Sequence, residues 1–149
     1  MAQALNQFQQ TAERGQVAYL NCDSFKMSAV VDSSETGTLK AGDAVKIVTT
    51  SKGIPHVAKV AVSDTSCFGV VVFNAVKNDG IKAGDRIEVA FTGAFMYMEA
   101  STAIYAGTAL DYAYDTGKVA AANSGLGIGV AMEAAAADGD LIAVYVKTI

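Results

Sequence analysis

Two stretches of the chain place a lysine, a glycine and an aspartate close together, a combination also found in phosphate- and cation-binding loops. They are "LKAGDAVKIV" at Leu39–Val48 and "IKAGDRIEVA" at Ile81–Ala90. A phosphate loop needs its lysine after the glycines and a helix behind them, whereas here the lysine comes first and a strand-like run follows. A calcium loop needs several oxygen ligands at short spacing, and "DSSE" at Asp32–Glu35 is too sparse. We therefore expect no cofactor and no metal.

The residues that could act in catalysis are few and lie far apart in the sequence. The only histidine, His56, directly follows the only proline, Pro55, at the start of a predicted strand. No nucleophile motif such as Gly-x-Ser-x-Gly accompanies it, so we expect His56 to be a surface or turn residue. Cys22 and Cys67 form no Cys-x-x-Cys pair, and we expect two buried thiols rather than a disulfide or a metal site. The sequence thus predicts a protein that is not an enzyme.

Several tyrosines could line a carbohydrate-binding face. They are Tyr97, Tyr105, Tyr112, Tyr114 and Tyr145. The chain has no tryptophan, and no regular pattern of Asp or Asn accompanies these tyrosines. Core packing and contacts between subunits are therefore the favoured interpretation, and a receptor- or glycan-binding module stays as the alternative.

Glycine-centred turns recur around the lysine-containing stretches. The same order of turn and alternating apolar run occurs at Ala41–Asp43, Ala83–Asp85, Ala106–Thr108 and Asp138–Asp140. Glycine permits the positive φ of a tight turn, and the following Asp or Thr can accept hydrogen bonds from turn amides. Because Thr108 replaces the aspartate in one copy, the glycine is the common requirement. We interpret the Gly-Asp pairs as structural turns rather than as a binding site used twice.

Alternating apolar residues and turns continue from Val17 to the end of the chain and predict about ten short strands. This indicates a mainly β fold, a compact antiparallel barrel or sandwich in one domain over residues 17–149. Ala134–Ala137 and Met98–Gly107 predict one or two short helical turns. "FGVVVFNAVKNDGIKAGDRIEV" and "IGVAMEAAAADGDLIAVYV" share one order of glycine, strand, turn and Gly-Asp strand, which predicts a two-strand unit used twice.

The first sixteen residues differ from the rest of the chain. Leu5, Phe8 and Ala12 recur at a spacing that places them on one face of a helix, but the segment is too short and polar to be stable alone. Residues 1–16 are therefore predicted to be an N-terminal arm that orders against a partner, or else a frayed tail. In the first case Leu5, Phe8 and Ala12 are the candidate contacts with the partner or another subunit.

Composition limits the function classes further. The 149 residues carry a net charge of −4, which gives no basic field for nucleic acid. With 52% hydrophobic and only 17% charged residues, the chain is not disordered, and part of its surface is expected to be covered by other subunits. No apolar run is long enough for a signal peptide or a membrane span, so we expect synthesis in a cytoplasm and no membrane partner.

An ordered set of short motifs runs through the C-terminal half. It consists of a Gly-Asp strand, a glycine-centred strand, an Ala-Gly turn, Thr-Gly-Lys-Val, Ile-Gly-x-Ala-x-Glu-Ala-Ala and a closing Gly-Asp strand, at Gly84–Val89, Thr92–Phe95, Ala103–Leu110, Thr116–Val119, Ile128–Ala135 and Gly139–Val146. This set resembles the tailed-bacteriophage capsid decoration, or cement, proteins, and the match extends weakly back to Leu39–Val48.

The resemblance implies a small β-rich virion protein on the exterior of an icosahedral head. Such proteins commonly form homotrimers at three-fold points, where they clamp neighbouring subunits of the major capsid protein. Clamping needs buried area across a joint rather than chemistry, which fits a chain without a catalytic grouping.

Overall fold

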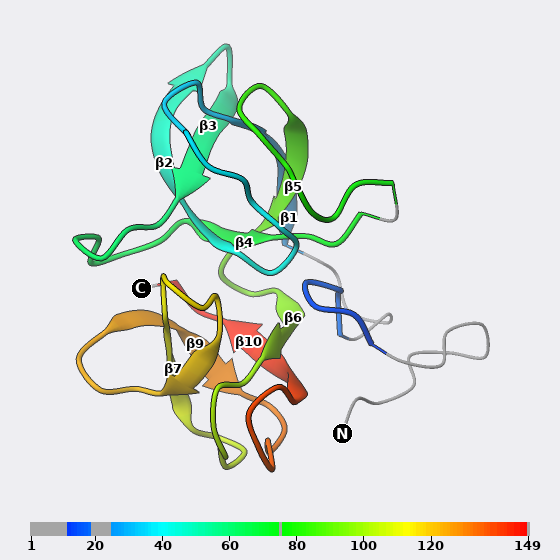
Figure 1. Ribbon diagram of the computed structural model, residues 1–149, viewed down its shortest axis with the longest axis vertical. Coiled ribbons are helices and arrows are strands. Elements are labelled where there is room, and N and C mark those ends of the chain that lie inside the picture. The colour runs from blue at the N-terminus through cyan, green and yellow to red at the C-terminus, as the bar shows by residue number, and fades with distance from the viewer. Residues whose placement is uncertain (1–11, 19–24, 75, 149) are drawn as a thin grey trace.

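The computed structural model describes residues 12–18, 25–74 and 76–148, and within them it has ten strands and no helix (Figure 1). The first five strands are β1 (Lys26–Val31), β2 (Ala44–Ser51), β3 (Ile54–Lys59), β4 (Gly69–Val71) and β5 (Arg86–Ala90). The other five are β6 (Phe95–Glu99), β7 (Ala109–Tyr112), β8 (Val119–Ala121), β9 (Leu126–Ala131) and β10 (Leu141–Val146). The predicted mainly β fold of about ten short strands is confirmed.

Each set of five strands forms its own lobe, with the first lobe above the second in Figure 1. The first lobe is a closed barrel with the strand order β1-β3-β2-β4-β5, and the second is a sheet with the order β6-β10-β9-β7-β8. Among the described strands, β1 and β3 are the one parallel pair. The sequence predicts an antiparallel barrel or sandwich, and the other pairs of the barrel are antiparallel. Five strands cannot alternate in direction around a closed ring, so one neighbouring pair must run parallel.

The two lobes repeat one arrangement of five strands. Taken in chain order, β6 to β10 pair with one another as β1 to β5 do. An isolated parallel bridge between Ala100 and Val119 stands where the barrel pairs Val31 with Val57, so the second lobe also curls toward closure. The predicted two-strand unit is confirmed as β4–β5 and β9–β10, each an antiparallel pair. It belongs to a larger five-strand repeat.

The registers of the two lobes agree residue by residue. In the first lobe, the Cα partners across β2, β4 and β5 form a row that consists of Ala44, Val70 and Ala90. The matching row across β7, β9 and β10 consists of Ala109, Val130 and Tyr145. In both lobes a glycine precedes the middle residue of the row, and a β-carbon on Gly69 or Gly129 would clash with the carbonyl oxygen of Ala90 or Tyr145. The same close strand approach therefore recurs.

The Gly-Asp pairs form one turn used four times. The turn glycines have φ values of 86° to 91° and are Gly42, Gly84, Gly107 and Gly139. Asp85 accepts a hydrogen bond of 3.0 Å from the Lys82 amide, and the aspartates of the first and fourth turns accept from the amide three residues earlier in the same way. Thr108 lacks the carboxylate but keeps the backbone bond to the Tyr105 carbonyl, at 3.2 Å. The turn geometry is what recurs.

The helical turns expected at Ala134–Ala137 and Met98–Gly107 do not form. Instead, Ile104 and Ala135 form an antiparallel bridge, with hydrogen bonds of 3.0 and 2.9 Å between their backbones. The bridge corresponds to the Leu39–Ile81 bridge of the first lobe. Tertiary pairing in the repeat thus overrides the helix propensity of the alanines.

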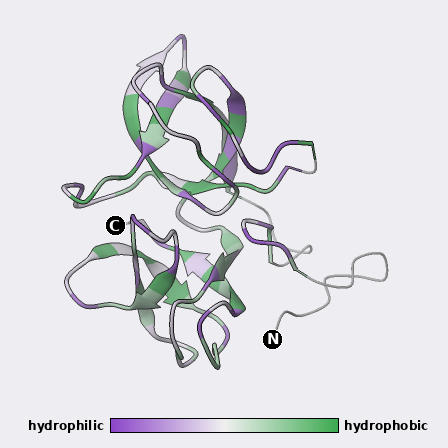
Figure 2. Cartoon of the chain, in the orientation of Figure 1, coloured by the Kyte–Doolittle hydropathy of each residue, from purple (hydrophilic) through white to green (hydrophobic). Residues whose placement is uncertain are grey.

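The apolar core extends through both lobes. One cluster fills the barrel and includes Val45, Val71 and Val89. A second cluster combines the outer row of the barrel with the interior of the second lobe, including Met96 and Tyr112. Figure 2 shows hydrophobic stretches on strands of both lobes. The first lobe therefore has an apolar face on its outside, and the second lobe packs against it.

The geometry of the glycine turn predicts which of two substitutions lowers the free energy of unfolding more. Gly84 has a φ of 89°, a conformation that costs a β-branched residue about 1–3 kcal/mol, so Gly84→Val should lower the free energy of unfolding by roughly that amount. Asp85→Asn keeps an acceptor for the Lys82 amide and should cost less. Urea unfolding of both variants measures the difference. A larger loss for Asp85→Asn would mean that the carboxylate has a role beyond the turn.

Candidate functional site

The groups that the sequence offered for catalysis are not arranged for it. His56 lies within β3, and its Nδ1 is 3.6 Å from Asp32 Oδ1. Ser34 donates its hydroxyl to Asp32 Oδ2 at 2.6 Å, and its amide donates to the same oxygen at 2.9 Å. These bonds lower the pKa of Asp32. The carboxylate thus holds the serine hydroxyl directly, whereas a triad needs the histidine between the two groups.

Cys67, the cysteine that the structure describes, is not activated as a nucleophile. Cys67 is a buried free thiol, and burial raises its pKa to about 12, so the thiolate form is suppressed at neutral pH. Cys22 lies outside the described residues. Across ranges 12–18, 25–74 and 76–148, no group of three His, Cys, Asp or Glu side chains could hold a metal ion. The same ranges contain no helix long and apolar enough to cross a membrane.

The tyrosines do not gather on one face. Tyr97 and Tyr112 lie in the core at 1% and 4% exposure, and Tyr145 packs against Phe95 with ring centroids 5.3 Å apart. Tyr105 is 85% exposed in the loop before β7, while Tyr114 lines a groove of about 510 Å³ between the lobes. Core packing accounts for two of the five, and the structure provides no continuous carbohydrate platform.

The most concentrated polar contacts lie in the joint between the lobes. The Arg14 guanidinium donates to the carbonyl oxygens of Ala41 and Gly42 in the first lobe and of Gly117 in the second. It also pairs with Asp43 Oδ1 at 3.1 Å. One side chain, with only 14% of its area exposed, therefore ties the N-terminal segment to both lobes.

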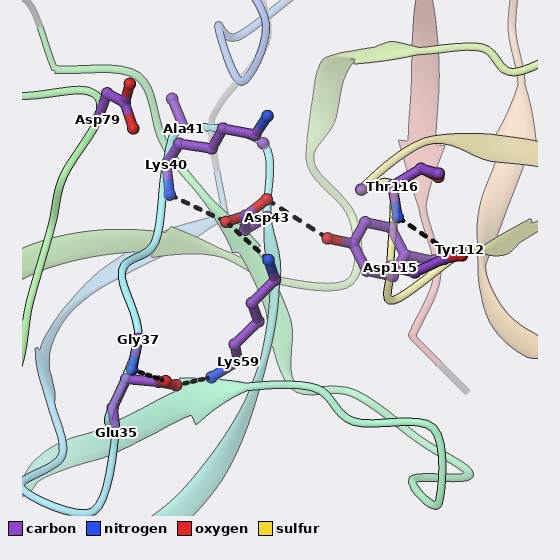
Figure 3. A network of polar contacts seen from close by, with 12 residues as sticks. Glu35, Gly37, Lys40, Ala41, Asp43, Lys59, Asp79, Tyr112, Asp115 and Thr116 are labelled. Carbon is purple, nitrogen blue, oxygen red and sulfur yellow. Dashed lines mark hydrogen bonds and ion pairs between the residues drawn. The ribbon is translucent and has the colours of Figure 1, made fainter.

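Asp43 is the anion at the centre of this joint, and only 1% of its side chain is exposed. Figure 3 shows it between Lys40, Lys59 and Tyr112. The Lys40 amide donates to Asp43 at 2.9 Å, the Tyr112 hydroxyl lies 3.4 Å away and Lys59 Nζ lies at 3.9 Å. Burial and then the Asp43 charge raise the pKa of Tyr112 to about 12, so the hydroxyl keeps its proton and can donate.

The segment before β1 completes the second lobe along the free edge of β6. Val17 bridges Met96, and the Gly15 amide donates to the Tyr97 carbonyl at 2.8 Å. The Phe73 amide, in the first lobe, donates to Gly15 at 2.9 Å. Ala12 is 5% exposed and packs in a cluster with Ala18, Tyr97 and Ala143. Leu5 and Phe8 lie outside the described residues, so the role of Leu5, Phe8 and Ala12 as partner contacts stays a prediction.

Several large apolar side chains lie exposed on the surface. The exposed large hydrophobic residues are Phe25, Met27, Ile47, Val48, Val62, Val76, Tyr105, Tyr114 and Met132. A cavity of about 430 Å³ beside β5 is bordered by the Lys77–Asp85 ion pair, whose atoms are 2.7 Å apart. Both carboxylates on its border are paired, Asp85 with Lys77 and Glu88 with Lys26 at 3.2 Å, so neither is left free for acid–base work.

Removing Arg14 should weaken the joint strongly. Arg14→Ala leaves Asp43 buried without its guanidinium partner, and the free energy of unfolding should fall by about 3–5 kcal/mol. Arg14→Lys should recover part of the loss, because an ammonium cannot reach four acceptors at once. Chemical denaturation measures both. Lys77→Ala breaks an exposed ion pair and is the matched control; equal losses for Arg14→Ala and Lys77→Ala would contradict a structural role for the joint.

The chain is similar to known phage proteins in sequence and in fold. The family model described as phage cement protein matches residues 26–147. The N base of the head fiber protein gp8.5 from bacteriophage phi29 has a similar fold, with a TM-score of 0.56 and 19% identity over 82% of this chain and 94% of that one. No curated protein matches the chain. Since the family match includes both lobes and all ten strands, the chain belongs to the phage cement protein family.

Proposed function

We propose that this protein binds the exterior of an icosahedral phage head and cements neighbouring subunits of the major capsid protein, as a homotrimer in the virion. The observation that carries the proposal is the family match, which starts at β1 and ends one residue after β10. The phi29 protein of similar fold is itself described as part of a head fiber, which supports a location on the head.

A cement protein must resist separation of the subunits that it joins. Such a role needs a rigid body and about 800 Å² of buried surface on each partner. The joint around Arg14 and Asp43 and the shared core link the two lobes into one rigid body. Because the tyrosines are dispersed, we find no observation that favours the receptor- or glycan-binding alternative.

Heads that lack the protein provide the direct test. Adding the purified protein should raise the temperature at which such heads release their DNA, because bound cement opposes subunit separation. Dye access to DNA during heating measures this release. Arg14→Ala protein serves as a comparison, since a weakened joint should transmit less force between the lobes. Heads that bind no protein, or that bind it without a change in release temperature, would contradict the cementing role.

The N-terminal residues can be tested separately. Deleting residues 1–11 removes Leu5 and Phe8 but retains Arg14 and the hydrogen bonds from Gly15 to both lobes. If the segment is an arm that contacts the head, the shortened protein should bind heads several-fold more weakly with an unchanged melting temperature. Cosedimentation with heads measures the binding. Equal binding by the full and the shortened protein would show that the segment is a tail.

A further inference from the structure

The repeat allows each surface of one lobe to be compared with its equivalent in the other. In the first lobe the outer row is covered: Ala44, Val70 and Ala90 are 0%, 0% and 1% exposed. They belong to the core cluster that contains the interior of the second lobe. Within one chain, therefore, the outer row of one five-strand unit receives the end of the next unit.

In the second lobe the described residues cover the equivalent row only in part. Ala109 is exposed, and Val130 and Tyr145 are each partly exposed. Met132 lies two residues after Val130 and is 43% exposed, whereas Val72, two residues after Val70 in the first lobe, is 8% exposed. The outer face of the first lobe thus packs against the second lobe, whereas the equivalent face of the second lobe is exposed.

The second lobe contributes one end of its sheet to the junction, and the described residues leave the corresponding end of the first lobe exposed. In the second lobe, the inward-facing residues Met96 and Tyr112 are 0% and 4% exposed. The equivalent residues of the first lobe follow from the strand registers. Met27 corresponds to Met96, because they pair with Val89 and Val144. Ile47 corresponds to Tyr112, because they pair with Val57 and Val119. The first-lobe equivalents are 39% exposed at Met27 and 47% at Ile47, and the neighbouring Val48 is 44% exposed. This end of the barrel is open.

We propose that the open barrel end of one copy, formed by Met27, Ile47 and Val48, docks on the open outer row of a second copy, formed by Ala109, Val130, Met132 and Tyr145. The contact repeats between molecules the junction that already joins the lobes within one molecule. It is heterologous, because two different surfaces meet, and such contacts generate closed rings or open chains of copies. The proposal concerns self-association and does not depend on binding to a head.

Charge favours the same orientation. The second lobe, residues 91–148, carries six carboxylates against two lysines. The first lobe, residues 25–90, carries eight basic side chains against seven carboxylates. A head-to-tail contact places the acidic lobe of one copy against the slightly basic lobe of the next, whereas contacts between two second lobes bring like charges together.

Light scattering over a range of protein concentrations tests the contact. The unaltered protein should form oligomers at about 100 µM or below, and Met132→Glu and Ile47→Glu should each weaken association at least about tenfold by burying a charge. Val76→Glu is the control, since Val76 is 94% exposed and lies on neither surface. A monomeric unaltered protein, or oligomers unaffected by both substitutions, would overturn the proposal.

Mixing the two variants distinguishes a head-to-tail contact from a symmetric one. The Met132→Glu protein keeps an intact barrel end, and the Ile47→Glu protein keeps an intact row, so an equimolar mixture should form one junction and stop at a dimer. A mixture that stays monomeric would refute the heterologous contact. Thermal melts identify any variant that fails to fold, and in that case Met132→Gln and Ile47→Thr replace it in the same experiment, with a smaller expected loss and the same criterion.

Discussion

The arrangement of the molecule depends on one buried carboxylate. Asp43 is almost fully enclosed, and a charge removed from water to this extent is tolerated only when it is paired and hydrogen-bonded. Its partners come from the N-terminal segment, the first lobe and the second lobe. The aspartates of two other turns close their own turns near solvent, so the joint is an added role of the first copy. Thr108 occupies the equivalent position in the second lobe; it carries no charge, so it needs no such partners.

The five-strand repeat explains why the outer apolar face of one lobe is covered and why the equivalent face of the other lobe is exposed. A five-strand unit with an apolar outer face needs something to cover it, and the second lobe covers the first. Within residues 12–18, 25–74 and 76–148, no further five-strand unit covers the equivalent face of the second lobe or the open barrel end of the first lobe. Met132 and Ile47 are exposed on these two surfaces.

Features set by local sequence could be predicted, and features set by long-range pairing could not. The strands and the four glycine turns follow from alternation and from the positive φ that glycine permits, so they were visible in the sequence. The parallel pairing of β1 with β3 follows from ring closure and has no local signal. The alanines of Ala134–Ala137 indicated a helical turn, but the Ile104–Ala135 bridge decides their conformation.

The joint was missed for the same reason. Arg14 contacts Asp43 and Gly117, which lie 29 and 103 residues away in the sequence, and no sequence pattern near Arg14 indicates either contact. The two-strand repeat was recognisable, but unequal loop lengths hid the five-strand repeat around it. Contact surfaces such as the outer rows have no motif at all, since they depend on exposure rather than residue type.

The most direct measurement is a cryo-electron microscopy reconstruction of phage heads saturated with the purified protein. The account predicts density for both lobes on the outer surface, spanning the boundary between neighbouring major capsid subunits. Density confined to the surface of a single subunit, or heads that remain bare at saturating protein, would contradict a cementing role.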